Sequence, residues 1–449
     1  MTYEECLNEM YGLRRFGIKL GLDVIERMLA GLNNPHHRFS CIHIAGTNGK
    51  GSIASYLAAM LTDAGYQTGL YTSPHLVRFN ERIAINGADI SDDDVVNAYL
   101  AVKAVHHGDR EPTFFEYTTA MALYAFAKAG VRWAVIETGM GGRLDATNIL
   151  TPEISVISNI SMEHSFYLGN TLADIAFEKG GIIKPDTPVV TGVRQKSATD
   201  VLRRIAAERN APFFRLGEHF RIRRNQAGGP VSGTSTVFSY YGGNLRLKNL
   251  HTSLAGSHQA DNAALSVAAA EILSEKGCAL LPESSIRAGL AGAVWPGRLE
   301  VLPTRPEVII DGAHNLEAAR RLNTFLRDYS AGRPVTMVIG ILDDKPLAAM
   351  LRCFLPLAGH VIFTQPLIDR RLPAEKLYEA ALRLFPDRPF STEITGSVPE
   401  AVRRAMESAQ PDHLVCIAGS LYVAGEARHE FERMASGEPA GRRTMPFIS

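Results

Sequence analysis

Short apolar runs rich in β-branched residues alternate with segments that place apolar residues at helical spacing throughout the first half of the chain. Strands are predicted at 41–45, 68–71, 133–137, 154–160 and 189–193. Helices are predicted at 53–64 and 114–128, and Gly65 and Gly130 follow them, as glycine commonly follows a helix. Strands that alternate with helices usually pair in parallel and are covered by those helices. The chain is therefore expected to be an α/β protein with a mostly parallel sheet.

The sequence pattern changes near residue 213. Short β-like runs with glycine-rich turns at 227–230 and 241–243 predict a small antiparallel β excursion over 213–250, and helical spacing returns at 258–273. Pro296 and Gly297 disfavour continuation of either element, so we expect a hinge at 294–298. A second alternating series follows, with strands at 308–310, 335–341, 360–364 and 414–418 and helices at 316–327, 374–384 and 398–408. We predict two domains, 1–297 and a smaller Rossmann-like α/β domain at 298–449.

The formal charges balance, because 47 Lys+Arg face 47 Asp+Glu and the net charge is zero. Nucleic acids and anionic membranes attract broad basic surfaces, so we expect neither as a partner. No uncharged stretch of membrane-spanning length occurs, and the start of the chain carries Glu4, Glu5 and Glu9 without an apolar run. Five scattered cysteines form no Cys-x-x-Cys pair. A cytoplasmic monomer is expected.

The segment Ala45-Gly46-Thr47-Asn48-Gly49-Lys50-Gly51-Ser52 lies between a predicted strand and a predicted helix. Glycines let backbone N–H groups surround an anion, and a helix N-terminus adds a positive dipole end. Lys50 can reach the β- and γ-phosphates, and the Ser52 hydroxyl can bind phosphate or a metal. The position five before Gly49 is Ile44, so the segment departs from the standard Walker pattern, and an incidental glycine-rich turn is the alternative. We predict a nucleotide phosphate loop formed by Thr47, Asn48, Gly49, Lys50, Gly51 and Ser52, and we expect Lys50 to be catalytic as well.

Four segments, taken in order, resemble the signatures of one ligase family. They are Gly46–Ser52, Ser73-Pro74-His75-Leu76, Glu137-Thr138-Gly139-Met140-Gly141-Gly142-Arg143-Leu144-Asp145-Ala146-Thr147-Asn148 and Asp311-Gly312-Ala313-His314-Asn315. The ordered set is similar to the Mur ligase superfamily, and most closely to its folylpolyglutamate synthase/dihydrofolate synthase branch. Each segment alone is moderately specific, whereas the set in this order is highly specific.

The resemblance implies an ATP-dependent ligase that adds L-glutamate to dihydropteroate or to a reduced folate. In such enzymes ATP phosphorylates the acceptor carboxylate, and the amine of glutamate then attacks the acyl phosphate. The resemblance also implies ATP binding by the domain at 1–297, a glutamate-ligase domain at 298–449, and two Mg²⁺ ions as cofactors. It leaves open whether one or both acceptors are used and how many glutamates are added.

By resemblance, Ser73, Glu137 and His164 are metal ligands, and each lies at or just after the end of a predicted strand, where α/β sheets gather ligands. The residues themselves allow other roles: a turn serine, a Glu137–Arg143 ion pair, and a hydrogen-bonded loop histidine. A histidine ligand is less usual for Mg²⁺, so the identity of the metal depends on the resemblance. Glu163 replaces the family's usual aspartate, and its role stays open.

Lys179 has two competing interpretations. Thr171 and Asp174 predict a capping box at the start of a helix that runs toward Gly180, so Lys179 occupies the last turn, where a cation favours the helix dipole. By resemblance, the segment Glu178–Ile182 instead carries a catalytic, carbamylated lysine that helps to hold the second Mg²⁺. Carbamylation would convert a cation into an anionic oxygen ligand.

The resemblance implies acceptor contacts by Phe115, Glu116, Tyr117 and Thr118 and by Leu144, Asp145 and Ala146. Aromatic side chains can stack on a flat heterocycle, but amphipathic core packing is an equal alternative for the first segment. On the nucleotide side the resemblance implies Asn262, Arg298 and Asp311, together with a catalytic His314. The alternatives are a surface arginine for Arg298 and a helix N-cap for Asp311. Lys345 fits the family's C-terminal domain without an assigned role.

Three other functions compete with this one. A related ligase acting on a cell-wall nucleotide precursor would usually carry an extra N-terminal domain, whereas 45 residues precede Gly46. A nucleotide-dependent switch protein would leave the segments around Glu137, His164 and Lys179 unexplained. A folate-binding module without catalysis is disfavoured by Lys50 and Asp311.

Overall fold

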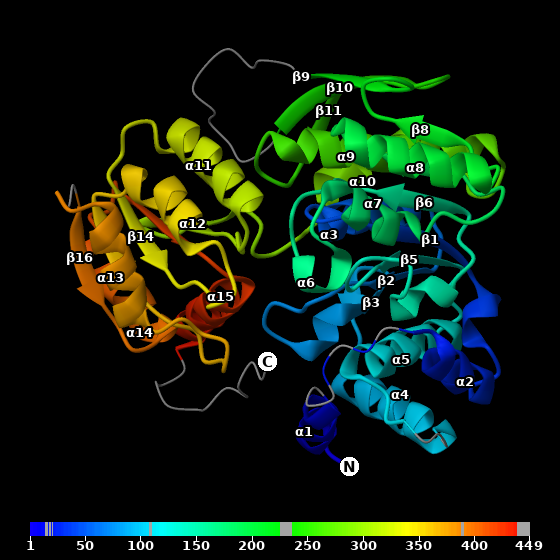
Figure 1. Cartoon of the computed structure of the whole chain (residues 1–449), viewed down its shortest axis with the longest axis horizontal. Coiled ribbons are helices and arrows are strands. Elements are labelled where there is room, and N and C mark those ends of the chain that lie inside the picture. The colour runs from blue at the N-terminus through cyan, green and yellow to red at the C-terminus, as the bar shows by residue number, and fades with distance from the viewer. Residues whose placement is uncertain are drawn as a thin grey trace. The chain divides into compact units, whose positions relative to one another are not determined.

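The computed structural model describes residues 1–13, 17, 19, 21–106, 110–224, 236–387 and 390–437, which form two compact units (Figure 1). Unit 1 comprises Met1–Gln226, Thr236–Ser253 and His258–Val294. The described part of unit 2 comprises Leu254–Ser257 and the chain from Trp295 onward. The units thus divide at Val294 and Trp295, three residues before the boundary that we predicted. The turn predicted at 227–230 lies outside the described residues.

An eight-stranded sheet with the order β4-β3-β2-β5-β1-β6-β7-β8 forms the centre of unit 1. Its parallel strands are β1 (Ser40–Ala45), β2 (Thr68–Tyr71), β5 (Trp133–Glu137), β6 (Ile154–Ile157), β7 (Val189–Thr191) and β8 (Phe213–Arg215). Two short antiparallel strands, β3 (Ile83–Ile85) and β4 (Ala88–Asp89), complete one edge. Parallel strands that are buried on both faces give continuous apolar runs, which is why the sequence predicts the central strands closely.

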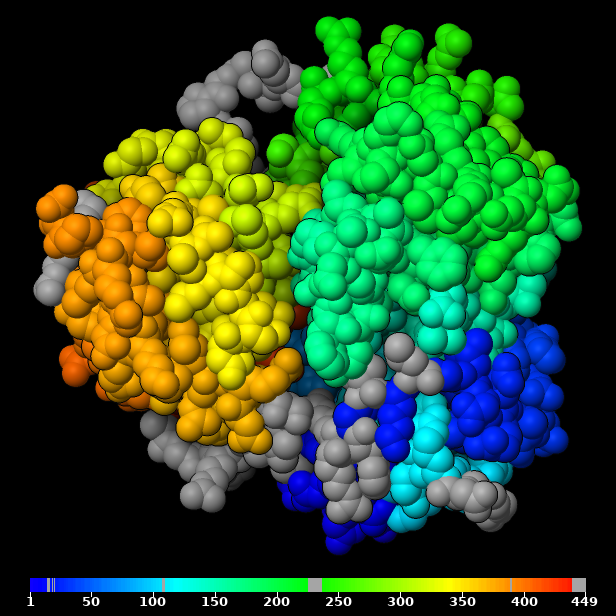
Figure 2. All heavy atoms as spheres, in the orientation of Figure 1, coloured from blue at the N-terminus to red at the C-terminus, as the bar shows by residue number. Residues whose placement is uncertain are grey.

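Helices cover both faces of this sheet (Figure 1). A core cluster unites the apolar sides of α1 (Tyr3–Gly12), α2 (Asp23–Gly31), α4 (Asp92–Val105) and α5 (Phe114–Lys128) with the sheet. Three further helices, α3 (Lys50–Asp63), α9 (His258–Glu275) and α10 (Glu283–Gly292), pack on one another on the other side. A separate cluster joins α7 (Leu172–Gly180) and α8 (Lys196–Glu208) to β6 and β7. In Figure 2 the blue-green α6–α7 segment and the green α8 segment lie at the visible surface.

The antiparallel excursion is a three-stranded sheet of β9 (Arg221–Arg224), β10 (Thr236–Tyr241) and β11 (Arg246–Thr252), in the order β11-β10-β9. The predicted start of this excursion at residue 213 is wrong, because β8 pairs in parallel with β7 of the main sheet. A strand of three half-buried residues shows too little periodicity to reveal which sheet it joins.

Unit 2 has a six-stranded sheet with the order β12-β13-β17-β14-β15-β16. The strands are β12 (Glu300–Leu302), β13 (Glu307–Ile310), β14 (Val335–Ile339), β15 (His360–Phe363), β16 (Ser391–Ile394) and β17 (Leu414–Ala418). Among these described strands, β12 runs antiparallel to its neighbour and the others pair in parallel. Its helices are α11 (Leu316–Ser330), α12 (Leu347–Phe354), α13 (Ala374–Leu384), α14 (Val398–Ser408) and α15 (Leu421–Ser436). The predicted α/β fold, with its mostly parallel sheet, antiparallel excursion and second α/β unit, is confirmed.

Candidate active site

The phosphate-loop segment joins the end of β1 at Ala45 to the start of α3 at Lys50. Gly49 is the N-cap of α3 with φ +87°, and a Cβ atom there would lie 2.6 Å from Asn262 Oδ1. Gly46 has φ +148°, and a Cβ atom there would overlap Ser158 Oγ. Both positions therefore require glycine, for the backbone conformation and for the space.

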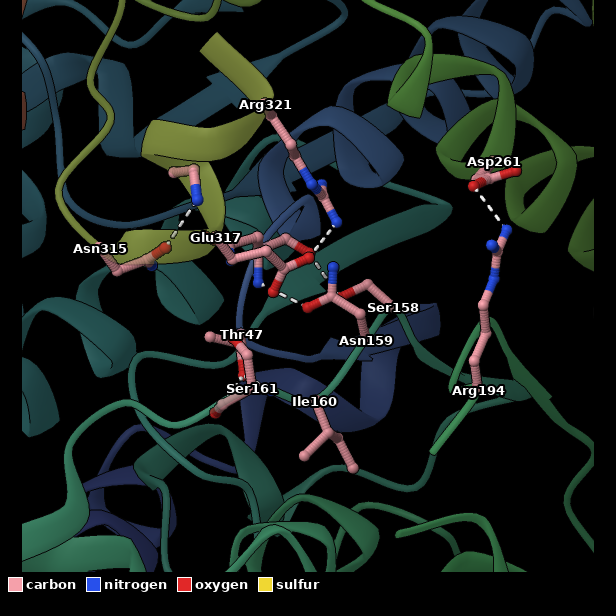
Figure 3. A network of polar contacts seen from close by, with 12 residues as sticks. Thr47, Ser158, Asn159, Ile160, Ser161, Arg194, Asp261, Asn315, Glu317 and Arg321 are labelled. Atoms are coloured by element: carbon pink, nitrogen blue, oxygen red, sulfur yellow. Dashed lines mark hydrogen bonds and ion pairs between the residues drawn. The ribbon is translucent and has the colours of Figure 1, made fainter. Parts of the chain in front are cut away.

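The loop that follows β6 braces the phosphate loop (Figure 3). The backbone N–H of Thr47 donates to Asn159 O at 2.9 Å, and that of Asn48 donates to Asn159 Oδ1 at 2.9 Å. Ser158 Oγ donates to Asn48 O at 2.8 Å, and the N–H of Ser161 donates to Thr47 Oγ1 at 3.0 Å. The sequence prediction missed these bracing residues because it extended the strand to residue 160, whereas β6 ends at Ile157. Polar residues directly after an apolar run were the available signal.

Lys50, Glu137 and Ser73 lie together at the carboxyl ends of adjacent strands. Lys50 Nζ donates to Gly46 O at 3.2 Å and lies 3.7 Å from Glu137 Oε1. The backbone N–H of Ser73 donates to Glu137 Oε2 at 3.4 Å, and the Glu137 side chain is 5% exposed. A nearly buried carboxylate beside a serine and a lysine offers oxygen ligands of the kind that a hard cation prefers.

The alternative role of Glu137, an ion pair with Arg143, is wrong. Arg143 instead donates to Glu178 Oε1 at 2.9 Å, and its guanidinium lies over the Phe177 ring. Its partner is therefore on α7, one residue before Lys179. Glu137 is left facing Lys50 and Ser73 and is not neutralised by the arginine that follows it in sequence.

His164 lies in the left-handed region, with φ 52°, at the N-cap of the short helix α6 (Ser165–Leu168), and its side chain is exposed. No group of three or more His, Cys, Asp or Glu side chains with metal-holding geometry occurs within the described ranges. Ser73 and Glu137 fit a cation site by their donor chemistry and proximity. The inclusion of His164 as a third ligand stays a prediction.

Lys179 lies in the last turn of α7, whose Thr171–Asp174 capping box is confirmed. The side chain is buried and its Nζ donates to Gly46 O at 2.8 Å, so it reaches the phosphate loop. Burial, with a smaller contribution from Lys50, lowers the pKa of Lys179 to about 7, although Glu163 and Asp145 oppose this shift. A surface lysine that merely favours a helix dipole would not show this environment.

The start of α9 contacts the start of α3. Gln259 Nε2 lies 3.2 Å from Ser52 Oγ, and Asn262 Nδ2 donates to Gln259 Oε1 at 3.0 Å. The structure thus brings together three predicted nucleotide residues, Gly49, Ser52 and Asn262, through a glutamine that the prediction did not single out. Asp261 also anchors this helix end, since Arg194 and Arg224 both pair with it (Figure 3 shows the Arg194 pair).

Two residues of the first predicted acceptor segment have structural partners inside unit 1. The Glu116 carboxylate accepts from Thr113 N at 2.7 Å, which closes the capping box of α5, and pairs with Arg110 at 2.7 Å. Tyr117 is buried, and its hydroxyl donates to Tyr99 O. Core packing and helix capping therefore account for both side chains, and their contact with an acceptor stays a prediction.

Phe115 and Thr118 contact residues at the carboxyl ends of β2 and β5. The Thr118 hydroxyl lies 3.0 Å from that of Tyr71 at the end of β2. Phe115 is half-buried, and its ring lies so close to Gly139 that a Cβ atom there would be 2.5 Å from Phe115 Cζ. Phe115 is thus the aromatic residue of this segment that packs against the glycine-rich loop after β5.

The second predicted acceptor segment turns around a buried carboxylate. Asp145 Oδ2 accepts from Met140 N at 2.8 Å, and Asp145 Oδ1 accepts from Thr147 N at 3.0 Å. Burial raises the pKa of Asp145, and these hydrogen bonds oppose the shift. Ala146 is buried in the core, whereas Leu144 is half-buried. Asp145 therefore stabilises the loop, and the acceptor contacts of this segment also stay predictions.

In unit 2, Asp311 follows β13 and organises its own loop. Its Oδ2 accepts from Leu299 N at 2.8 Å and its Oδ1 accepts from Ala313 N at 2.9 Å. Burial raises the pKa of Asp311, against the opposing charge of Arg298. Arg298 packs against Gly312, where a Cβ atom would lie 2.8 Å from its Nη1.

The alternative role of Asp311 as a helix N-cap is wrong. Asn315 is the N-cap of α11, and its Oδ1 accepts from Ala318 N at 2.9 Å (Figure 3). His314 Nδ1 lies 2.9 Å from Gly312 O, in the same loop. Lys345, in the loop after β14, pairs with Asp344 at 2.9 Å and gains no assigned role.

No helix among the described residues combines the length and the apolar composition that crossing a bilayer requires.

The two units match two family models, the Mur ligase middle domain over residues 44–270 and the Mur ligase glutamate ligase domain over residues 297–421. The chain is 36% identical over 436 residues to a dihydrofolate synthase/folylpolyglutamate synthase of Bacillus subtilis, with 95% of this chain and 98% of the relative covered. It is also similar to Escherichia coli FolC in complex with DHPP and ADP, with TM-score 0.87, 28% identity and coverage of 98% of this chain and 99% of the other. It is similar as well to a bifunctional folylpolyglutamate synthase/dihydrofolate synthase of Yersinia pestis, complexed with AMPPNP and Mn ion. That comparison has TM-score 0.84, 29% identity and coverage of 96% of this chain and 98% of the other.

The fold and the phosphate-loop site are those of a Mur-type ligase, an ATP-dependent enzyme that forms amide bonds. Within that class, the chain belongs to the folylpolyglutamate synthase/dihydrofolate synthase family.

Replacing Gly49 by alanine should abolish nucleotide binding, because a Cβ atom at φ +87° would meet the Asn262 amide. Gly65→Ala is the matched control, since Gly65 has φ +86° with nothing within 4 Å. Both variants should lose about 1 kcal/mol of stability from backbone strain. Titration calorimetry with ADP should detect binding to Gly65→Ala and not to Gly49→Ala. Equal ADP affinities would show that the close approach of Asn262 is unimportant.

Proposed function

We propose that this enzyme joins L-glutamate to the carboxylate of dihydropteroate, of a reduced folate, or of both. The observation that most directly supports this proposal is that two lysines, Lys50 and the buried Lys179, both donate to the Gly46 carbonyl beside Glu137. A family relative named for both activities, and another solved with DHPP and ADP, support a choice of acceptors within the folate class.

The chemistry requires positioning and charge neutralisation. A carboxylate is a poor electrophile because oxide is a poor leaving group. Transfer of the γ-phosphoryl group from ATP to the acceptor oxygen releases ADP and supplies phosphate as the leaving group. The amine of glutamate then attacks the acyl carbon, the C–O bond to phosphate breaks, and the amine loses a proton. Lys50 and the backbone amides of Thr47 to Ser52 would bind the phosphates through this sequence.

A divalent metal, which we propose to be Mg²⁺ as two ions, would neutralise the charge on the phosphates when bound. Ser73 and Glu137 would hold one ion, with His164 as the third ligand by resemblance. The relative solved with AMPPNP also contains Mn ion, which supports a divalent ion as a cofactor. Mg²⁺ prefers oxygen ligands, and the serine and carboxylate provide them.

We further propose that Lys179 is carbamylated and helps to hold the second ion. The neutral amine is the form that attacks CO₂, and the product carbamate is anionic after one proton is lost. An ordinary lysine at pH 7 is neutral in about one molecule in three thousand, whereas a pKa of about 7 makes about half of Lys179 neutral. Burial therefore prepares this lysine for the modification.

Asn262, Arg298 and Asp311 are proposed to bind the nucleotide, and His314 is proposed to be catalytic. The glutamate-ligase model that covers unit 2 supports L-glutamate as the amine substrate. We also expect a cytoplasmic location and a monomeric state, of which light scattering measures the second directly. The alternative function, a nucleotide-dependent switch protein without ligase activity, predicts ATP binding without acceptor-dependent turnover.

Release of ADP should depend on acceptor and glutamate together. The purified chain is incubated with ATP, Mg²⁺ and glutamate, with dihydropteroate or tetrahydrofolate supplied separately. At least one acceptor should stimulate ADP release, with a product heavier by one glutamyl residue in mass spectrometry. Nucleotide binding without stimulation by either acceptor would contradict the proposed substrate class.

Lys179→Ala should lower kcat by about two orders of magnitude, because an electrostatic ligand at the phosphates is lost. Acetate should restore part of the activity by supplying a carboxylate in the vacated space. The control is Lys184→Ala, since Lys184 is also partly buried and donates to a backbone carbonyl, Asn148 O at 2.7 Å, away from the phosphate loop. Equal losses in the two variants, without rescue by acetate, would restore a purely structural role for Lys179.

Glu137→Gln should raise the Mg²⁺ concentration needed for half-maximal turnover by about tenfold or more, because the side chain keeps its size and loses its charge. Chelation of divalent metal should abolish turnover of the wild type. Glu153→Gln, which changes a carboxylate near the amino end of β6, should leave the Mg²⁺ dependence unchanged. An unchanged Mg²⁺ dependence in Glu137→Gln would remove Glu137 from the metal site.

A further inference from the structure

A histidine occupies the middle of β1, at the centre of the main sheet. His43 is fully buried, and its strand pairs with β5 on one side and β6 on the other. Its neighbours along the strand, Ile42 and Ile44, are apolar and fully buried. A central parallel strand normally carries apolar side chains alone, so His43 is an exception to the pattern of its own strand.

The Thr147 hydroxyl lies between His43 and Asp145 and determines which way their hydrogen bonds run. Thr147 Oγ1 lies 2.6 Å from Asp145 Oδ1 and 2.8 Å from His43 Nε2. The single hydroxyl proton of Thr147 goes to the carboxylate, which accepts, so the same oxygen accepts from His43 Nε2–H. Burial lowers the pKa of His43 to about 3, and the ring is neutral with its proton on Nε2.

We call the chain of hydrogen bonds from His43 through Thr147 to Asp145 the relay, and it ends on the loop that follows β5. Besides the Thr147 hydroxyl, Asp145 accepts from the backbone N–H groups of Met140 and Thr147. These bonds fix the path of the glycine-rich segment Gly139–Gly142, against which Phe115 packs. His43 on β1 is therefore connected, through two side chains, to the loop that follows the neighbouring strand.

The arrangement is costly in the folded state. His43 Nδ1 is buried and has no hydrogen-bond partner among the described residues. An unsatisfied buried nitrogen is unfavourable, and an aliphatic side chain at this position would avoid it. Buried polar groups that are kept despite such a cost often serve a functional site.

We propose that His43 is a positioning residue for the acceptor: through Thr147 and Asp145 it holds the Gly139–Gly142 loop in the conformation that receives the acceptor. The proposal rests on the proposed function, since it assigns the acceptor to this loop. The phosphate loop has its own bracing, from Asn159, Ser158 and Lys179, so loss of the relay leaves the nucleotide site in place.

The first test compares His43→Leu with His43→Gln. Leucine fills the space without a donor, so the KM for the acceptor should rise about tenfold, as expected for one lost hydrogen bond. The KM for ATP should stay within about twofold, and the melting temperature should not fall. The glutamine amide can place an N–H near the Nε2 position, so His43→Gln should recover most of the acceptor affinity. Equal increases of both KM values, or no recovery with glutamine, would overturn the proposal.

A double-mutant cycle with Thr147→Val tests the relay itself. Because valine removes the hydroxyl that accepts from His43, the double variant His43→Leu/Thr147→Val should have the acceptor KM of Thr147→Val alone. Additive effects would show that His43 acts by another route. Wild-type turnover is measured in the same assay, so a failed relay is distinguished from a failed proposed function: in the second case the wild type itself shows no acceptor-dependent turnover.

Discussion

The carbonyl oxygen of Gly46 accepts hydrogen bonds from two lysine side chains, Lys179 at 2.8 Å and Lys50 at 3.2 Å. Two ammonium groups that share one acceptor repel each other, and Lys50 indeed contributes to the lowered pKa of Lys179. The site relieves this repulsion if one of the two lysines is neutral or modified, and the buried one is the candidate. The two side chains meet because α3 and α7 follow the adjacent parallel strands β1 and β6.

Strand order explains how the remaining groups reach that point. Adjacent strands β2, β5, β1 and β6 run in parallel, so their carboxyl ends lie along one edge. Ser73, Glu137, the phosphate loop and Asn159 each lie at or just after the end of one of these strands, at positions far apart in the sequence. The sheet therefore supplies proximity, whereas the hydrogen bonds between the loops supply the finer arrangement.

The sequence predicted the buried strands well and the contacts between loops poorly. Thr68–Tyr71, Trp133–Glu137 and Leu414–Ala418 have the bounds that their apolar runs predict, because burial on both faces leaves a continuous signal. Asn159 was not identified because the predicted strand extended to residue 160, past the end of β6. Gln259 was not identified because a single glutamine in a helix has no characteristic sequence pattern. The alternative Glu137–Arg143 ion pair was also a contact between loops that the sequence could not settle. Arg143 is near Glu137 in sequence, but its partner in the structure is Glu178 on α7.

The chain has no net charge, yet two lysines lie together at the phosphate loop. A chain with equal numbers of acids and bases could neutralise its buried cations with carboxylates, and elsewhere it does so, as in the Arg110–Glu116 pair. At the phosphate loop both lysines donate to a backbone carbonyl, and Lys50 also lies 3.7 Å from Glu137 Oε1, within ion-pair distance. The Gly46 carbonyl holds the Lys50 ammonium group without cancelling its charge, whereas Lys179, whose pKa is lowered, is the lysine that we propose to be carbamylated. The balance of charge in the composition therefore does not determine the charge at this loop, which depends on how each of the two lysines is held.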